Sequence, residues 1–323
     1  MPNVIASRNT GFTSCPKPRA RCAKVSPTMA LLALLSMPSS AASQQLLTAA
    51  DLPDLEWPSP DASISYGEGP LQFGHLRLPP GDGPYPVLVF IHGGCWLSAF
   101  DIKHAGQAEQ ALADAGFAVW SLEYRRVGNE AGGWPGTFLD IANGVDHLSE
   151  LGREYPLDLD RVLAVGHSAG GHLALWAAAR SGIPSGSELY IARPLQIHGV
   201  LALAPAPDLE ALHRTGVCGD VIDGLMGGSP GVHPERYDVA SPMRLMPAGV
   251  PQRLIVGRHD EAWGPGGRAY FEAAQRAGGS PVTLLEAPES GHFEMIVPST
   301  STWPYVTQEL GSLLLQVTQS AGR

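Results

Sequence analysis

Short, continuous runs of apolar residues recur along the chain, each bounded by glycine, proline or other turn residues. The six clearest runs cover 86–91, 117–123, 161–165, 199–204, 253–257 and 282–287. Continuous apolarity, in place of strict alternation with polar residues, is typical of strands that are covered on both faces. The pattern therefore predicts a mostly parallel central sheet with helices on both faces.

Longer stretches with the helical spacing of apolar residues separate these strands. They cover 104–116, 138–152, 171–182, 268–279 and 305–317. Regular alternation of strand and helix is the signature of a doubly wound α/β domain. A further strand at 71–80 ends at the turn sequence PPGDGPYP, and we expect it to be an antiparallel edge strand.

One long segment, 205–247, breaks this alternation and is rich in glycine, proline and charged residues. Long irregular segments inside compact domains are commonly functional loops or lids. We therefore expect 205–247 to be an irregular segment that covers part of a site, with an ordinary surface loop as the alternative.

The first 44 residues differ in composition from the rest of the chain. Residues 1–28 carry five of the 21 Lys and Arg residues and no acidic residue, and 29–37 are mainly apolar. This order, followed by small residues near Ala42, indicates a secretory signal that is too short to span a bilayer. We expect a leader at 1–44, an exported (periplasmic or secreted) domain at 45–323, and no stable membrane insertion. The alternatives are a tail on a cytoplasmic protein and a true start at a later methionine, at position 29.

The charge and the cysteines narrow the possible partners. The chain has 21 Lys and Arg against 31 Asp and Glu residues, a formal net charge of -10. Nucleic acids are bound through clustered Lys and Arg, so a nucleic-acid partner is not expected. Cys15 and Cys22 lie in the leader, and the remaining Cys95 and Cys218 are too few for a disulfide framework. Neither cysteines nor histidines have the spacing of metal ligands, which predicts no metal.

The sequence AVGHSAGGH at 164–172 places Ser168 between Gly166 and Gly170, directly after an apolar strand and before a helix. The pattern G-x-S-x-G in a strand–turn–helix context is typical of a nucleophile elbow. Small residues on both sides let the chain bend tightly, and the bend exposes the serine hydroxyl. Ser168 is therefore the candidate nucleophile.

A serine hydroxyl needs a base, and the base needs a partner that fixes its tautomer. In this type of fold these partners follow the serine, with the acid first and the histidine last. Asp260 comes just after the strand at 253–257, and His292 comes after the strand at 282–287. Catalytic groups of parallel sheets gather at such strand ends. We expect Asp260 as the acid, with Glu261 as its rival, and His292 as the base.

The loop FIHGGCW at 90–96 follows the first central strand and can supply backbone N–H groups to the oxyanion of acyl transfer. Its glycines keep side chains out of the way of the substrate. We expect the N–H of Gly94, of Cys95 or of both, together with that of Ala169, to form the oxyanion hole. Trp96 and Trp263 are expected to line an apolar substrate pocket, with burial in the core as the alternative.

Four segments, HGGCW, GHSAGGH, GRHDEAW and SGHFEMI, together resemble the α/β-hydrolase superfamily, in particular its bacterial esterase branch. The similarity extends to hormone-sensitive-lipase-like, feruloyl-esterase-like and kynurenine-formamidase-like enzymes, and it includes the segment LEYRRVGNEAGGWPGTFLDI. It implies an α/β-hydrolase fold. The residues that it assigns to the site are Ser168, Asp260 and His292 as the triad, and Gly93, Gly94, Cys95 and Ala169 around the oxyanion. Cys95 departs from the H-G-G-G loop of lipases, so no large separate cap domain is expected.

These features predict a serine esterase that acts on a small-molecule ester and needs no cofactor. His292 takes the Ser168 proton, Ser168 attacks the ester carbonyl, and water later releases the acyl group. Short acyl chains are expected because no large apolar cap is evident. An amide hydrolase of the arylformamidase or acyl-peptidase type is the enzymatic alternative, and a catalytically inactive binding module on the same fold is the other.

Overall fold

The structure is a computed structural model that describes residues 46–52 and 57–321. The described residues lie within one compact unit. Within these ranges no helix is both long enough and apolar enough to cross a membrane. The predicted leader at 1–44, with its apolar stretch at 29–37, lies outside the described residues.

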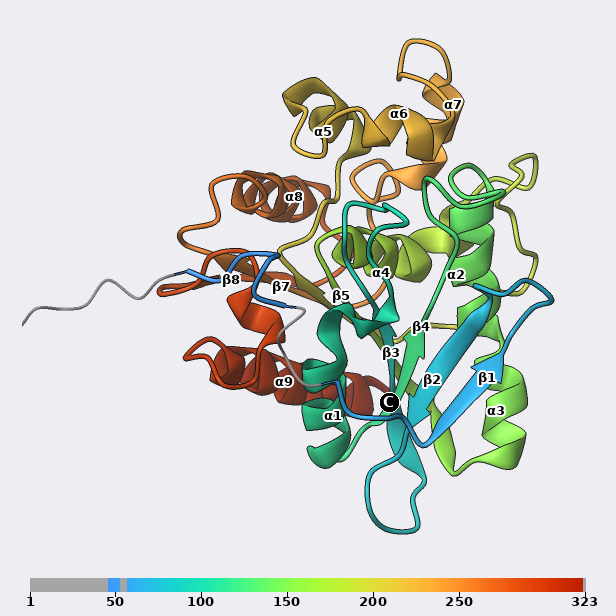
Figure 1. The fold of residues 1–323 in the computed structure, drawn as a ribbon, viewed down its shortest axis with the longest axis vertical. Coiled ribbons are helices and arrows are strands. Elements are labelled where there is room, and N and C mark those ends of the chain that lie inside the picture. The colour runs from blue at the N-terminus through green and yellow to red at the C-terminus, as the bar shows by residue number, and fades with distance from the viewer. Residues whose placement is uncertain (1–45, 53–56, 322–323) are drawn as a thin grey trace, which may run out of the picture. The chain divides into compact units, whose positions relative to one another are not determined.

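Eight strands of the described residues form one sheet with the spatial order β1-β2-β4-β3-β5-β6-β7-β8 (Figure 1). They are β1 (Ala62–Ser65), β2 (Phe73–Arg77), β3 (Tyr85–Ile91), β4 (Ala118–Leu122), β5 (Leu157–His167), β6 (Gly199–Leu203), β7 (Gln252–Gly257) and β8 (Val282–Ala287). The strands from β4 to β8 in the spatial order are mutually parallel. The predicted mostly parallel sheet is therefore confirmed.

The strand predicted at the sheet edge lies one position further in. β2 pairs antiparallel with β1 on one side and with β4 on the other. The edge belongs to β1, a four-residue strand in which half-buried and exposed residues alternate. The prediction that 71–80 is an edge strand was wrong, because the sequence ASIS of β1 is too short and too polar to be recognised as a strand.

Two groups of helices cover the two faces of the sheet (Figure 1). The helices α1 (Gly106–Asp114) and α9 (Trp303–Ala321) pack on one face, and α2 (Gly136–Asp146), α3 (Leu148–Glu154), α4 (Ala169–Ala179) and α8 (Gly264–Ala277) pack on the other. Along β3, Val87, Val89 and Ile91 belong to the core beneath α4, whereas Leu88 and Phe90 belong to the core beneath α1 and α9. Central strands are thus apolar on both faces, which explains their continuous apolar runs.

The helix predicted at 138–152 is two helices in the structure. α2 ends at Asp146 and α3 begins at Leu148, with His147 between them. Both helices bury apolar side chains against the same core, among them Val145 and Leu151. The apolar spacing continues across the break, so the pattern alone did not separate them.

Nearly half of the segment 205–247 is helical. It contains α5 (Leu209–Thr215), α6 (Val221–Met226) and α7 (Pro234–Ala240), which lie together at the top of Figure 1. Asp208 caps α5 by accepting the N–H of Ala211 at 3.0 Å, and Gly216 and Gly227 end α5 and α6 in the left-handed conformation. The prediction of an irregular segment was wrong for these three helices, because helices of six or seven residues contain too few apolar repeats to show a period.

Candidate active site

The predicted catalytic residues lie at the carboxyl ends of parallel strands. Gly94 and Cys95 follow β3, Ser168 follows its neighbour β5, Asp260 follows β7 and His292 follows β8. Because these strand ends share one edge of the sheet, residues far apart in the sequence come together there. Four of the five line one cavity of about 130 Å³, and Asp260 contacts that cavity through His292.

Ser168 occupies a tight turn between β5 and α4. Its backbone has φ of 56° and ψ of -118°, and its N–H donates to the carbonyl of Leu203 at 2.8 Å. A Cβ on Gly166 would overlap the backbone of Gly170, and a Cβ on Gly170 would overlap the carbonyl of Ile91. The two glycines of the motif are therefore required by close backbone contacts. A strained serine held in place by its neighbours is typical of a nucleophile elbow.

His292 forms a hydrogen bond from Nδ1 to Oδ2 of Asp260 at 2.6 Å. The Asp260 side chain is only 3% exposed, and its second oxygen accepts the backbone N–H of Trp263 at 2.9 Å. The bond at Nδ1 fixes the tautomer in which Nε2 of His292 is the nitrogen that can accept a proton. Trp263 lines the same cavity, and its ring stacks on that of His292 at 5.1 Å. Glu261, the rival acid, is exposed.

The loop after β3 turns through three consecutive residues with positive φ, at Gly94 (108°), Cys95 (49°) and Trp96 (52°). Among the described residues, the N–H groups of Gly94 and Cys95 form no backbone hydrogen bond. The N–H of Ala169 is the first of α4 and has no acceptor within the helix. These three donors can stabilise a negatively charged oxygen beside Ser168.

Four residues predicted for the site do not line this cavity: Asp260, which contacts it through His292, Ala169, Gly93 and Trp96. Gly93 is buried beside two imidazoles, where a Cβ would lie 3.1 Å from Nε2 of His104 and from Nδ1 of His167. Trp96 is completely buried in the main core and packs edge-on against His172 at 5.2 Å. The left-handed turn at Trp96 places this side chain in the core, so the alternative of core burial holds for it.

A buried polar network supports the oxyanion loop from behind. The hydroxyl of Tyr124 donates to the carbonyl of His92 at 2.9 Å, and Arg126 lies 3.1 Å from Nε2 of His92 while pairing with Glu123. Burial, together with the charge of Arg126, lowers the pKa of His92 to about 3. His92 is therefore neutral at physiological pH and can accept the hydrogen bond of Arg126. Glu123, Tyr124 and Arg126 of this network belong to the sequence LEYRR, which is part of the segment that resembles the esterases.

Two histidines that the sequence analysis did not place in the site, His104 and His167, contact the loop of the predicted base. Nε2 of His167 lies 2.8 Å from the carbonyl oxygen of His292, and Nδ1 of His167 lies 2.9 Å from Nε2 of His104. Burial lowers the pKa of His104 to about 3 and the pKa of His167 well below its ordinary value. Both rings are therefore neutral, so His104 donates to His167, which donates to His292. The sequence feature that could have pointed to His167 as part of the site is its position directly before Ser168.

A disulfide joins Cys95 of the oxyanion loop to Cys218, which lies between α5 and α6. Sequence analysis missed this bond, because the two cysteines are 123 residues apart and no spacing rule relates them. The disulfide holds the connection between α5 and α6 beside Cys95, which lines the cavity, but no residue of 205–247 lines the cavity itself.

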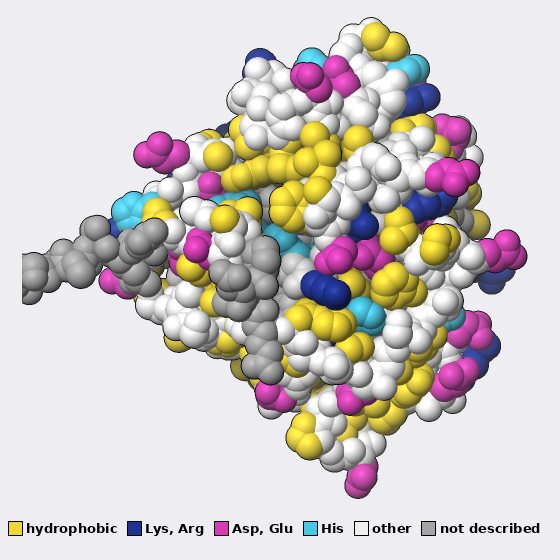
Figure 2. Space-filling model, in the orientation of Figure 1, with side chains coloured by type: hydrophobic (Ala, Val, Ile, Leu, Met, Phe, Trp, Pro, Cys, Tyr) yellow, Lys and Arg dark blue, Asp and Glu magenta, His cyan; other side chains and the backbone are white. Residues whose placement is uncertain are grey.

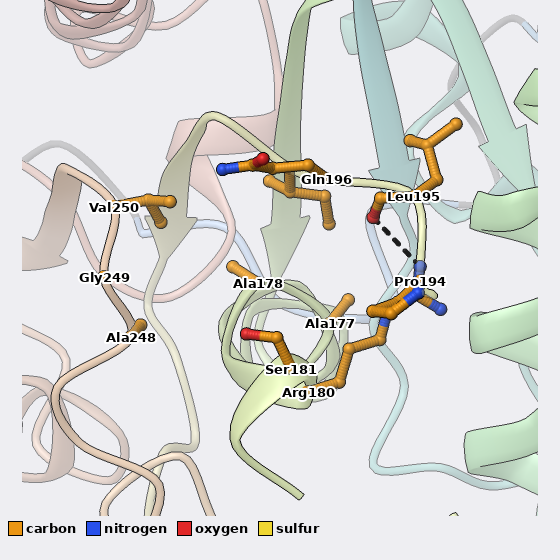
Figure 3. Close-up of a pocket in the computed structure, with 11 residues that line it drawn as sticks. Ala177, Ala178, Arg180, Ser181, Pro194, Leu195, Gln196, Ala248, Gly249 and Val250 are labelled. Carbon is orange, nitrogen blue, oxygen red and sulfur yellow. Dashed lines mark hydrogen bonds between the residues drawn. The ribbon is translucent and has the colours of Figure 1, made fainter. Parts of the chain in front are cut away.

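A separate cavity of about 300 Å³ lies at the end of α4 that is remote from Ser168 (Figure 3). Arg180 lines it and donates to the carbonyls of Leu195 at 3.1 Å and Ala142 at 3.0 Å. The described residues that line it include no His, Cys, Asp or Glu, so it lacks a general base. Across residues 46–52 and 57–321, no group of three or more such side chains could hold a metal ion.

The sequence model of the BD-FAE family matches residues 76–263, which is more than half of the chain. This match covers the oxyanion loop, Ser168 and Asp260. The chain therefore belongs to the BD-FAE family of α/β-hydrolase esterases.

Individual relatives are similar to the chain at low sequence identity. Esterase LipC of Mycobacterium tuberculosis is 23% identical over 278 residues, which are 77% of this chain and 68% of LipC. An acetyl-hydrolase of Streptomyces hygroscopicus is 28% identical over 286 residues, which are 78% of this chain and 89% of that protein. The solved structure of esterase B from Lactobacillus rhamnosis matches with a TM-score of 0.71 and 21% identity, over 84% of this chain and 93% of esterase B. This likeness confirms the predicted α/β-hydrolase fold.

Proposed function

We propose that the protein is a serine esterase that hydrolyses carboxylic esters with short acyl groups. Ser168 is the nucleophile, His292 the general base and Asp260 the acid that orients it. The observation that carries the proposal is the 2.6 Å hydrogen bond of His292 with Asp260 beside a cavity that Ser168 lines. Membership of an esterase family supports a carboxylic ester as the substrate.

The first half of the reaction forms an acyl-enzyme. Nε2 of His292 takes the proton of the Ser168 hydroxyl while the serine oxygen attacks the ester carbonyl carbon. The N–H groups of Gly94, Cys95 and Ala169 donate to the oxygen that becomes negative, and a single such donor contributes roughly 3 kcal/mol. When the C–O bond breaks, the proton on His292 passes to the departing alcohol oxygen.

The second half of the reaction repeats these steps with water. His292 takes a proton from a water molecule, whose oxygen attacks the acyl carbon on Ser168. The proton then returns to the serine oxygen as the carboxylic acid leaves. In both halves Asp260 stabilises the imidazolium form of His292 and keeps Nδ1 protonated, which its buried position beside that nitrogen supports.

The size of the cavity supports a short acyl group. Its volume is about 130 Å³, and the aromatic side chains of Phe100, Trp263 and Phe293 form part of its wall. Rigid aromatic walls leave little room for a long chain. The acetyl-hydrolase among the relatives supports the same size of acyl group.

The proposal extends to the place where the enzyme works. We propose that residues 1–44 are removed as a secretory leader and that the domain at 45–323 acts outside the cytoplasm. The disulfide between Cys95 and Cys218 supports export, because disulfides persist mainly in oxidising compartments.

A series of p-nitrophenyl esters from acetate to dodecanoate tests this function, with N-formylkynurenine as the competing amide substrate. We expect the highest kcat/KM for acetate to butyrate, and a loss of at least about 10⁴-fold in kcat for Ser168→Ala. A dodecanoate optimum would contradict the short acyl group. Faster formamide cleavage would contradict an esterase, and an unimpaired Ser168→Ala variant would contradict the nucleophile.

A further inference from the structure

Beside the catalytic cavity lies a second one, of about 210 Å³, between α5 and the first turns of α8. Trp263 lines both this cavity and the catalytic one, so the two cavities meet at this residue. We propose that this cavity binds the alcohol half of the substrate and selects esters of apolar alcohols. The inference rests on the proposed function and specifies its substrate class.

The walls of the second cavity suit an apolar ligand. They include Pro205, Pro207, Ala211, Leu212, Trp263 and Ala269. Two charged side chains also border it: Asp208, whose carboxylate accepts the N–H of Ala211 at 3.0 Å, and Arg214, which is exposed. Hydrophobic side chains gather in the same place in Figure 2, between the α5–α7 helices and α8 and next to histidine side chains. Transfer of an alkyl or aryl group from water into this cavity would lower the free energy of the complex.

The position of the leaving alcohol oxygen decides which half of the ester lies at this cavity. The proton on Nε2 of His292 passes to the departing alcohol oxygen, so that oxygen must lie within hydrogen-bonding reach of His292. Trp263 stacks on the His292 ring at 5.1 Å, with 22° between the two planes. The alcohol therefore lies on the side of Trp263 and of the second cavity. The acyl group is left with the remaining wall of the catalytic cavity, where Phe100 borders Gly94.

The position of Trp263 is fixed by the catalytic residues themselves. Its backbone N–H donates to Asp260 at 2.9 Å, and its side chain is only 8% exposed. The backbone of Trp263 is bound to the acid and its ring stacks on the base, so the ring cannot move away without disturbing them. Trp263 therefore keeps its position where the two cavities meet, and the room for the acyl group and the room for the alcohol can differ within one substrate.

Two isomeric esters, hexyl acetate and ethyl hexanoate, test the assignment because they carry the same atoms and place the long chain on opposite sides of the carbonyl. In the wild-type protein we expect kcat/KM for hexyl acetate to exceed that for ethyl hexanoate by at least about tenfold. Equal values, or a preference for ethyl hexanoate, would overturn the proposal.

Filling the cavity provides a second, independent measurement. Ala269 is exposed at the cavity wall, so Ala269→Trp and Ala269→Asp should both fold. We expect each to raise KM for hexyl acetate by about tenfold while ethyl acetate is unaffected. The matched control is Ala115→Trp, an exposed alanine at the end of α1 on the opposite edge of the sheet. Equal losses on both esters would overturn the proposal.

Failure of the inference and failure of the proposed function are distinguishable. If ethyl acetate is not hydrolysed, or is still hydrolysed by Ser168→Ala, the esterase proposal fails and the alcohol site fails with it. If ethyl acetate is hydrolysed through Ser168 but neither the isomer comparison nor the filled variants show selectivity for the alcohol chain, only the alcohol site is wrong.

Discussion

Nε2 of His167 donates a hydrogen bond to the backbone carbonyl oxygen of His292, at 2.8 Å. This bond joins the residue before the candidate nucleophile to the candidate base. His104 in turn donates to Nδ1 of His167 at 2.9 Å, so two neutral imidazoles connect the segment Ile102–Ala105, the nucleophile strand and the loop of the base. Gly93 makes room for this pair, because a side chain there would contact both rings.

The first prediction concerns His167 as a positioning residue for His292. His167→Leu removes the donor to the His292 carbonyl, and we expect kcat to fall by roughly tenfold to a hundredfold with little change in KM, since small misplacements of catalytic groups are costly. His167→Gln keeps an N–H donor at a similar reach and should recover most of the activity. Steady-state kinetics on p-nitrophenyl acetate, with a full pH profile for each variant, measures this.

The comparison between the two His167 variants separates positioning from general damage. If His167→Gln and His167→Leu lose the same activity while both melt like the wild-type protein, the hydrogen bond to His292 has no role in catalysis. A rise in KM without a fall in kcat would equally contradict it.

The second prediction concerns the choice between Asp260 and Glu261. Asp260→Asn keeps the size of the side chain but no longer fixes the productive tautomer of His292, and the expected loss in kcat is about 10⁴-fold. Glu261→Gln removes the charge of the exposed neighbour and should leave kcat within a factor of about two. The kinetic constants of both variants at pH 8 show which residue is the acid. A large loss of kcat in Glu261→Gln would identify Glu261 as the acid in place of Asp260.

The third prediction concerns the disulfide between Cys95 and Cys218. It closes a loop of more than a hundred residues, so Cys218→Ser should lower the free energy of unfolding by about 2–4 kcal/mol. Cys95 also supplies a proposed oxyanion donor, and the loss of its anchor should reduce kcat as well. Guanidinium denaturation and kinetics, each with and without dithiothreitol, measure the two effects.

The reductant serves as the internal control for this disulfide. Dithiothreitol should bring the wild-type protein to the stability of Cys218→Ser and should not affect that variant further. An equal effect of the reductant on both proteins would show that the disulfide does not stabilise the fold.

The fourth prediction concerns stability in acid. The pKa of His104 is lowered to about 3, mainly by burial, whereas in the unfolded chain it has its ordinary value near 6.5. Below pH 6.5 the unfolded chain therefore binds a proton that the folded protein does not, and stability falls as the pH drops toward 3. His104→Gln should lose less free energy of unfolding between pH 7 and pH 5 than the wild-type protein, by about 1–2 kcal/mol.

Urea denaturation at constant ionic strength measures this pH dependence. His259→Gln is the matched control, because it also replaces a histidine by glutamine but at an exposed position. Identical slopes for the wild-type protein and His104→Gln would contradict a buried, neutral His104.

Much of the fold was predictable because the central strands carry a simple signal. β3 and β5 are apolar on both faces, and the order of Ser168, Asp260 and His292 follows the strand ends of a parallel sheet. The elements that were missed are local and short. β1 has four residues, and α5 to α7 have six or seven each, so neither the period of a strand nor that of a helix can show.

The missed parts of the site depend on contacts between distant segments. Cys95 and Cys218 come together only because the α5–α6 connection folds back over the strand ends, which no spacing reveals. Trp96 and Trp263 are both aromatic residues close to a catalytic motif, yet one is buried in the core and the other lines the cavity. The left-handed loop after β3 turns the side chain of Trp96 into the core. The residue type alone does not show whether a tryptophan at this place lies in the core or at the cavity.

The central claim is that His292 activates the hydroxyl of Ser168. Reaction with a fluorophosphonate, followed by mass spectrometry of the digested protein, tests it most directly. We predict a single adduct on Ser168 in the wild-type protein and a rate of labelling at least about a hundredfold lower in folded His292→Gln. An adduct at another residue, or labelling at the wild-type rate without His292, would contradict the account.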